Sequence, residues 1–166
     1  MSDPLAIYLH DHLAGSHFAV ELLESLTDQY SGEELGGFAG GILAEIKEDQ
    51  QVLEGLIGHV AVRHFDLKSA AAWLGEKVSR VKLGRGGTAE IGTFEALELL
   101  ALGIQGKLAL WRVMQVIAEV DSRVRGDNFA QLAVRAENQF RQVEEYRLKI
   151  ARNAFTLVQD KPVGTH

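Results

Sequence analysis

An acidic residue lies where a helical pattern in this sequence calls for an apolar one. The apolar stripe recurs at helical spacing and comprises Ile42, Ile46, Leu53, Leu56 and Ile57. Asp49 falls on the same stripe. Because a buried, unpaired carboxylate is too costly, such an acid either binds a metal ion or pairs with a buried base. These two alternatives define the chemistry that the chain could carry.

Counting residues from the predicted turns places further polar side chains at the height of Asp49. Asp49 comes 18 residues after Ser31, and His12 comes 19 residues before Ser31. Asp49 and His12 should therefore lie at the same height in an antiparallel helix pair. If the third long helix runs parallel to the second, Lys107 falls at this height. On the fourth helix, Gln139, Val143 and Glu144 come closest. The predicted buried polar layer comprises His12, Asp49, Lys107 and Glu144.

A different path of the chain would change half of this layer. If the connection between the second and third helices is short-range, Glu98 and Arg147 replace Lys107 and Glu144. Acids and bases are matched in either arrangement, which is what a buried ion-pair network requires.

The elements that carry these residues are predicted to be long helices. Prolines occur only at Pro4 and Pro162, so the strongest helix breaker is absent between them. Asp3 is the expected N-cap of a first helix that runs from Pro4 to about Tyr30. The segment 31–34 (SGEE) resembles a capping box that starts the second helix at once, and this helix ends near His64.

The second half of the chain adds two more long helices after a long connection. Within residues 65–88 we expect a short helix, Ala70 to Lys82, followed by a glycine-rich stop. The third helix is predicted over 89–120, with Phe94, Leu97, Ala101, Ile104, Leu108 and Trp111 facing inward. The fourth helix is capped by Asp127 and ends near Leu157, and residues 156–166 form a tail.

These lengths predict one all-α domain over residues 1–166, a four-helix bundle with a long crossover between its second and third helices. Over nearly the whole chain this layout resembles the ferritin-like superfamily. That resemblance implies a di-iron or di-manganese site made of one Glu from each of two helices and a Glu-x-x-His from each of the others.

The chain departs from the metal pattern of that superfamily. No Glu-x-x-His occurs in it, and the acids that could serve instead are Glu21, Glu45, Glu48 and Glu98. We therefore favour a metal-free bundle without a cofactor, in which acids pair with bases. A di-iron or di-manganese carboxylate protein, acting as an oxidase or a metal store, is the alternative.

Two further features could bind partners. A basic patch on the crossover comprises Lys77, Arg80, Lys82 and Arg85 and could hold an anion, although such a run is usually a solvated helix face. The second helix begins with Gly36, Gly37, Gly40 and Gly41. Four helix-weakening glycines indicate the close approach of a neighbouring helix or of a second subunit in a homodimer, or a bent first turn.

The bulk composition excludes several classes of protein. A net charge of -6 argues against a nucleic-acid binder, because no excess of bases is left to neutralise phosphates. Cysteine is absent, which rules out disulfides and thiolate sites. No signal peptide is visible, and the longest apolar runs are too short to cross a membrane. We expect a cytoplasmic, non-enzymatic protein with a structural or binding role.

Overall fold

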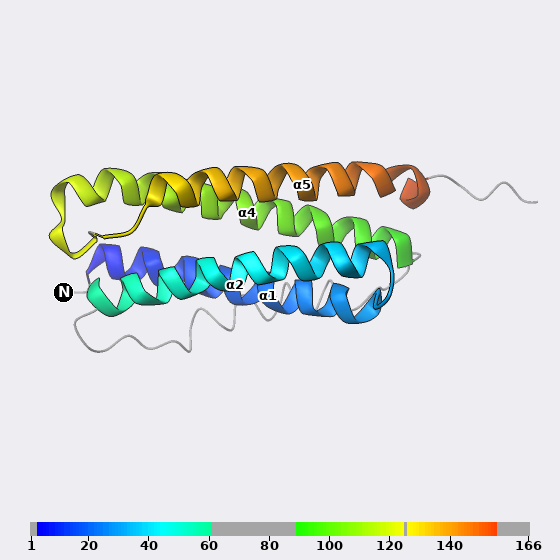
Figure 1. Cartoon of the computed structure of the whole chain (residues 1–166), viewed down its shortest axis with the longest axis horizontal. Helices are drawn as coiled ribbons and strands as arrows, with labels where there is room; N and C mark the ends of the chain where they lie inside the picture. The colour runs from blue at the N-terminus through cyan, green and yellow to red at the C-terminus, as the bar shows by residue number, and fades with distance from the viewer. Residues whose placement is uncertain (1–2, 61–88, 125, 156–166) are drawn as a thin grey trace, which may run out of the picture.

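A computed structural model describes residues 3–60, 89–124 and 126–155, which form four long α-helices and one short 3-10 helix (Figure 1). They are α1 (Pro4–Gln29), α2 (Glu34–Val60), α4 (Ala89–Val120), η1 (Ser122–Val124) and α5 (Phe129–Phe155). Over these residues the predicted all-α, four-helix class is confirmed. The predicted end of the second helix near His64, the crossover 65–88 with its short helix and the tail 156–166 lie outside the described residues.

The helix ends show where local sequence signals hold and where they fail. Asp3 caps α1 as predicted, because its Oδ1 accepts a hydrogen bond from the backbone N–H of Leu5 at 3.0 Å. The capping box predicted at residue 31 is wrong, since α2 begins only at Glu34. Gly32 has a φ of 83°, in the left-handed region, and this conformation interrupts the helical path between α1 and α2.

The cap of α5 is also displaced by one residue. Asn128, and not Asp127, accepts a hydrogen bond from the backbone N–H of Gln131 at 3.1 Å. Its side chain thereby satisfies one of the free N–H groups of the first turn.

The four helices form two antiparallel hairpins, α1–α2 and α4–α5 (Figure 1). The Tyr30 hydroxyl, just after α1, lies 2.5 Å from Thr93 Oγ1 in the first turns of α4. The start of α4 therefore lies near the start of α2, and these two helices run in the same direction. The end of α2 and the beginning of α4 are at opposite ends of the bundle.

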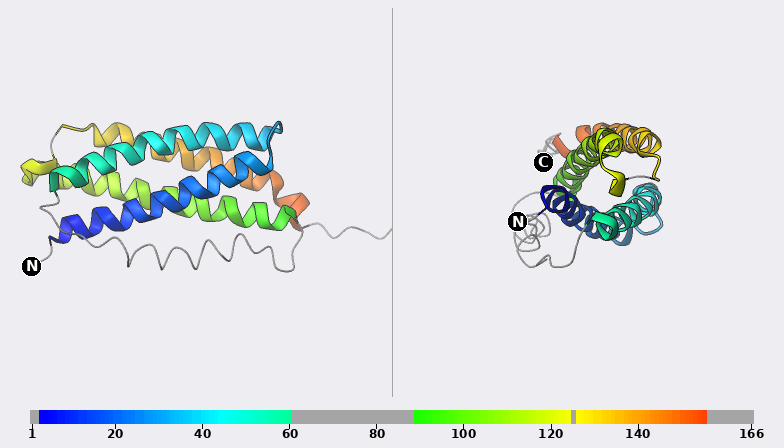
Figure 2. Two further views of the ribbon diagram at one scale, coloured as in Figure 1. Left: turned by 90° about the horizontal axis from the view of Figure 1, so that it is seen from below. Right: turned by 90° about the vertical axis from the view of Figure 1, so that its left-hand side faces the viewer.

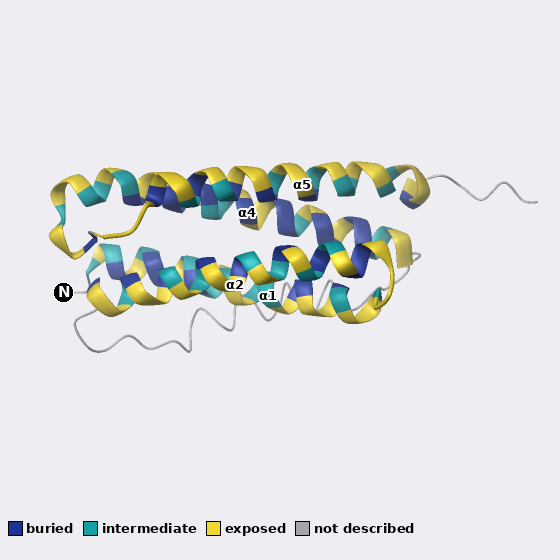
Figure 3. Ribbon diagram, viewed as in Figure 1, coloured by how far each residue is buried: buried dark blue, intermediate teal, exposed yellow. Residues whose placement is uncertain are grey.

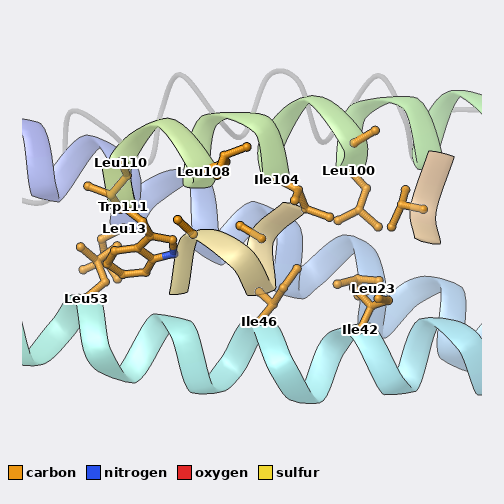
Figure 4. Packing of buried hydrophobic residues seen from close by; sticks show 14 of the residues in the cluster. Leu13, Leu23, Ile42, Ile46, Leu53, Leu100, Ile104, Leu108, Leu110 and Trp111 are labelled. Carbon is orange, nitrogen blue, oxygen red and sulfur yellow. The ribbon is translucent and has the colours of Figure 1, made fainter. Parts of the chain in front are cut away.

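The two hairpins meet along two sides. On one side α1 lies close to α4 (Figure 2). On the other side α2 and α5 face each other without packing closely. The short helix η1 contacts both α2 and α4. Buried residues form inward stripes on all four helices, and the outer faces are exposed (Figure 3). All six residues predicted to face inward on the third helix are buried. Within the core, Trp111 lies beside Leu13 and Leu53 (Figure 4).

The glycines at the start of α2 have different surroundings. A side chain on Gly36 would collide with the carbonyl oxygen of Tyr30, so the tight α1–α2 turn requires glycine there. A Cβ on Gly40 would make ordinary contact with Thr27, at 3.9 Å. Gly37 and Gly41 are exposed, and no atom of the described residues lies within 4 Å of an added Cβ. Close approach therefore explains Gly36 and does not explain the other three.

Candidate functional site

Asp49 on α2 and Lys107 on α4 form a buried ion pair in the middle of the bundle. Asp49 is only 2% exposed, although its neighbours on the stripe are aliphatic. The Lys107 ammonium donates a hydrogen bond to Asp49 Oδ2 at 2.5 Å. The parallel arrangement of α2 and α4 places both residues at one height, as counting from the turns predicts.

Two residues of α5 complete the surroundings of this pair. Arg135 donates to Asp49 Oδ1, so both carboxylate oxygens of Asp49 have a cationic partner. Gln139 is fully buried, and its Oε1 accepts a hydrogen bond from Lys107. The two α5 residues are four positions apart and therefore share one face of the helix.

The outer ends of this arrangement are two glutamates of α2. Gln139 Nε2 donates to Glu45 Oε2 at 2.8 Å, and Arg135 donates to Glu48 Oε2 at 2.8 Å. We call the whole set the central network; it comprises Glu45, Glu48, Asp49, Lys107, Arg135 and Gln139. It joins three helices through alternating donors and acceptors, as a buried set of charges requires.

The environment acts on the two cations in opposite directions. Burial lowers the pKa of the Lys107 ammonium, and the neighbouring Asp49 carboxylate opposes this effect only in part. Burial also lowers the pKa of the Arg135 guanidinium, but its charge interaction and hydrogen bonds with Asp49 and Glu48 outweigh burial, and the pKa is raised. Arg135 is thus the firmly charged member of the network.

The other two residues of the predicted layer do not join these contacts. His12 lies on α1 with its ring edge-on to Tyr8, at 4.7 Å between ring centroids. Burial lowers the pKa of His12, an effect that the nearby Asp11 carboxylate partly offsets. Glu144 is paired with Arg147 at 2.7 Å, and hydrogen bonding to that guanidinium lowers the pKa of Glu144. The placement of Glu144 in the layer is therefore wrong.

The error at Glu144 comes from the α4–α5 connection. Lys107 lies 13 residues before the end of α4, whereas Gln139 lies only 10 residues after the beginning of α5. Because the connection includes η1, α5 does not begin at the height at which α4 ends. Glu98 and Arg147, the residues of the alternative layer, do pair with each other at 3.0 Å, but at another level of the bundle.

The four acids of the di-metal alternative are not brought together. Glu21 and Glu98 are exposed, on α1 and α4. Glu45 and Glu48 are engaged by Gln139 and Arg135. Over the part of the chain that the structure describes, no group of three or more His, Asp or Glu side chains is arranged to hold a metal ion. The basic patch Lys77, Arg80, Lys82 and Arg85 lies outside that part.

A cavity lies against the central network on the side of α1. Its volume is about 220 Å³, it is open on one side, and its wall is formed by residues of α1, α2 and α4. Asp49 and Lys107 form part of its wall, together with His12 and Ser16 of α1. Most of the remaining wall is apolar and includes Trp111. The network therefore has a face toward a space in which a small molecule could be held.

Comparisons with known proteins leave the family of the chain open. The sequence matches no protein-family model, and neither the curated proteins nor the solved structures include a match. Among the described helices, none is both long and apolar enough to cross a membrane.

Proposed function

We propose that this chain is a non-enzymatic bundle of ferritin-like topology with a binding role, in which the central network takes the place of a di-metal site. The observation that carries the proposal is the position of the Lys107 ammonium, which lies between Asp49 of α2 and Gln139 of α5. A cation fixed to the protein occupies the region between facing helices in which metal-carboxylate bundles hold their ions.

Electrostatics supports this assignment. A divalent ion beside Asp49 would have to displace Lys107 or Arg135, because these two residues already occupy both carboxylate oxygens. It would also be repelled by whichever cation remained, and like charges at this depth are poorly screened. Gln139 carries no charge, and both ends of its amide are engaged within the network: Nε2 donates to Glu45 and Oε1 accepts from Lys107.

The course of the chain supports the ferritin-like part of the proposal. α2 and α4 run in the same direction, so residues 61–88 connect opposite ends of the bundle (Figure 1). A connection of this kind between the second and third long helices distinguishes ferritin-like bundles from bundles in which every helix follows its neighbour through a short loop.

Metal analysis of the purified full chain tests the proposal. After expression with added iron and manganese, we expect much less than one equivalent of either metal by plasma mass spectrometry. Two equivalents that are lost in Glu48→Ala, but retained in Glu137→Ala, would overturn the proposal in favour of a di-metal carboxylate protein. Glu137 is a suitable control because it is an exposed acid paired with Arg112 at 2.6 Å, away from the central network.

We also propose that the exposed glycines of α2 contact a second copy of the chain. Gly37 and Gly41 share one face of α2 and leave room for a close neighbour. Light scattering should then give the mass of a dimer, and Gly41→Trp should convert it to a monomer. The same replacement at Gly55, which is also exposed on α2 with open space around it, should leave the dimer intact.

A further inference from the structure

An open polar groove lies between α2 and α5, bordered by the central network. Its volume is about 560 Å³. Glu45 and Val52 of α2 form one wall, and residues of α5 and of the connection before it form the other. α2 and α5 face each other here without packing closely, so the groove follows the space that the two helices leave between them.

The α5 wall carries a row of carboxamide side chains. Gln131, Asn138 and Gln142 lie seven and four residues apart, so they share one face of the helix, and all three are exposed. Asn128 extends the row to the start of α5. Among the described residues, none hydrogen-bonds to the Gln142 side chain, and Asn138 uses its Oδ1 to accept from Arg141 at 2.9 Å. The amide N–H groups of Asn138 and Gln142 can therefore serve a ligand.

The chemistry and the length of this row fit an extended peptide. A carboxamide presents a donor and an acceptor side by side, which matches the C=O and N–H groups of a polypeptide backbone. From Asn128 to Gln142 the row is roughly 21 Å long, at the rise of an α-helix. An extended peptide rises about 3.3 Å per residue, so about six residues would lie along the row. Most of the wall is polar, whereas sites for compact small molecules are predominantly apolar.

The charges of the groove favour a basic peptide. Within the described wall Arg135 is the only cation, and its guanidinium is already paired with Glu48 and Asp49. Two carboxylates, those of Glu45 and Asp127, lie in the same wall. A lysine side chain of the ligand would meet this excess of negative charge, whereas an acidic peptide would be repelled.

The two walls also differ in a way that suits alternating side chains. Val134 lies between Gln131 and Asn138 on the α5 side and is 55% exposed. Glu45 lies on the α2 side. Because successive side chains of an extended peptide point in opposite directions, a small apolar residue can contact Val134 while its basic neighbour reaches Glu45.

We propose that this groove binds an extended, basic segment of a partner polypeptide, with its backbone hydrogen-bonded to the carboxamide row and a basic side chain paired with Glu45. The inference names a partner for the binding role proposed above. It rests on that proposed function, because a metal ion at Asp49 would release Arg135 and leave a second, unpaired cation in the wall of the groove.

NMR titration of the ¹⁵N-labelled full chain with a capped (Ala-Lys)₃ hexapeptide tests the inference. The side-chain NH₂ signals of Asn138 and Gln142 are assigned by their loss in Asn138→Ala and Gln142→Ala. We expect both signals to shift in a saturable manner. Capped (Ala-Glu)₃ should bind at least tenfold more weakly because its charges are reversed. An (Ala-Lys)₃ peptide with N-methylated alanines keeps its charges but loses half of its backbone donors, and it should also bind at least tenfold more weakly.

Matched carboxamide variants localise the binding. Asn138→Ala with Gln142→Ala should weaken the binding of (Ala-Lys)₃ at least tenfold, measured by calorimetry. Both residues are exposed, so the double variant should keep its fold. Gln105→Ala with Asn153→Ala removes two exposed carboxamides that do not line the groove and should bind as the wild type does.

A variant of Glu45 tests the charge separately. Glu45→Gln removes the carboxylate but keeps a side-chain oxygen that can accept from Gln139 Nε2, as Glu45 does. The preference for (Ala-Lys)₃ over (Ala-Glu)₃ should fall at least threefold in this variant. An unchanged preference would contradict the pairing of the ligand with Glu45.

Several other results would overturn the inference. They are the absence of a saturable shift, equal binding of the N-methylated peptide, tighter binding of (Ala-Glu)₃, or undiminished binding in the folded double variant. A dimer that becomes a monomer in the double variant, measured by light scattering, would identify a second copy of the chain as the occupant. Metal analysis of the same samples separates the two proposals. Metal-free protein that does not bind (Ala-Lys)₃ contradicts only the groove, whereas two bound metal equivalents contradict the proposed function itself.

Discussion

The two hairpins of this bundle are joined along two seams that are built from different side chains. Along the α1–α4 seam the helices approach closely, and the core there is aliphatic, with Leu13 and Leu110 near Trp111 (Figure 4). Along the α2–α5 seam the helices stand further apart. Long polar side chains bridge this second seam, chiefly Arg135 and Gln139 in its middle and Lys149 near its end.

This difference separates two tasks. Apolar contacts are non-directional, so the α1–α4 seam can supply stability over a range of small helix shifts. The hydrogen bonds of the α2–α5 seam are satisfied in only one register, because a shift of α5 by one turn would leave Asp49 buried without Arg135. We infer that the apolar seam holds the hairpins together and that the polar seam fixes how they align.

Removing the central cation should have the largest effect. Lys107→Met leaves one oxygen of the buried Asp49 and the amide oxygen of Gln139 without their donor. Breaking a buried pair from one side costs about 3–5 kcal/mol, and we expect a loss of this size in the free energy of unfolding measured with urea. An unchanged urea midpoint would contradict the burial of Lys107 beside Asp49.

Replacing the central charges together provides the control for that variant. Asp49→Leu with Lys107→Met and Arg135→Met removes all three paired charges and substitutes apolar side chains. Because a buried ion pair is often matched or exceeded in stability by well-packed apolar groups, the triple variant should recover most of the loss. We expect it to lose the fixed alignment of α5, visible as broadened NMR signals from that helix. Sharp, unshifted α5 signals would contradict the inference that the α2–α5 seam fixes the alignment of α5 against α2.

A disturbance within one hairpin, which leaves both seams intact, should have a smaller effect. A methyl group on Gly36 would overlap the Tyr30 carbonyl oxygen, and overpacking of this kind costs about 1–3 kcal/mol. Gly36→Ala should therefore lower the free energy of unfolding, measured by urea denaturation. Gly37→Ala, one residue further along with open space around it, should raise it by up to about 1 kcal/mol. Equal effects of the two variants would refute the tight-turn explanation.

Much of the fold, and half of the network, could be predicted from the sequence. The terminal positions of the two prolines and the apolar periodicity gave the bounds of α4 and the start of α1. Asp49 stood out because a single acid interrupts an aliphatic stripe. Its link to Lys107 followed from counting along helices, which have a fixed rise per residue.

The α5 side of the network was not predictable in the same way. α5 carries many charged residues, and the periodicity of its apolar face does not distinguish the partly buried Arg135 from exposed arginines such as Arg141. The one available signal was the position of Arg135 four residues before Gln139, a residue that counting had already placed near Lys107. The exact height depended on the α4–α5 connection, whose 3-10 helix leaves no strong local pattern.

Acid should lower the free energy of unfolding through His12, which lies on α1 in the wall of the cavity. Burial lowers the pKa of His12 below its ordinary value of 6.5, so the unfolded chain binds a proton more readily than the folded protein. Stability is therefore lost as the pH falls through 6.5 toward the lowered folded value, by about 1.4 kcal/mol for each pKa unit between the two states. His12→Gln should lose less stability than the wild type between pH 7.5 and pH 5.5 in urea titrations. Equal losses would show that His12 does not contribute to the acid sensitivity.

The smallest effect is expected at the exposed end of the polar seam. Lys149 pairs with Glu34 at 2.7 Å and joins α5 to α2, as Arg135 does, but both side chains are more than half exposed. Water and salt screen such a pair, and the fixing of two long side chains offsets most of its attraction. Lys149→Met should leave the urea midpoint unchanged within error, both at low salt and in 0.5 M sodium chloride. A loss comparable to that of Lys107→Met would mean that bridging the hairpins, and not burial of the charges, determines the strength of the α2–α5 seam.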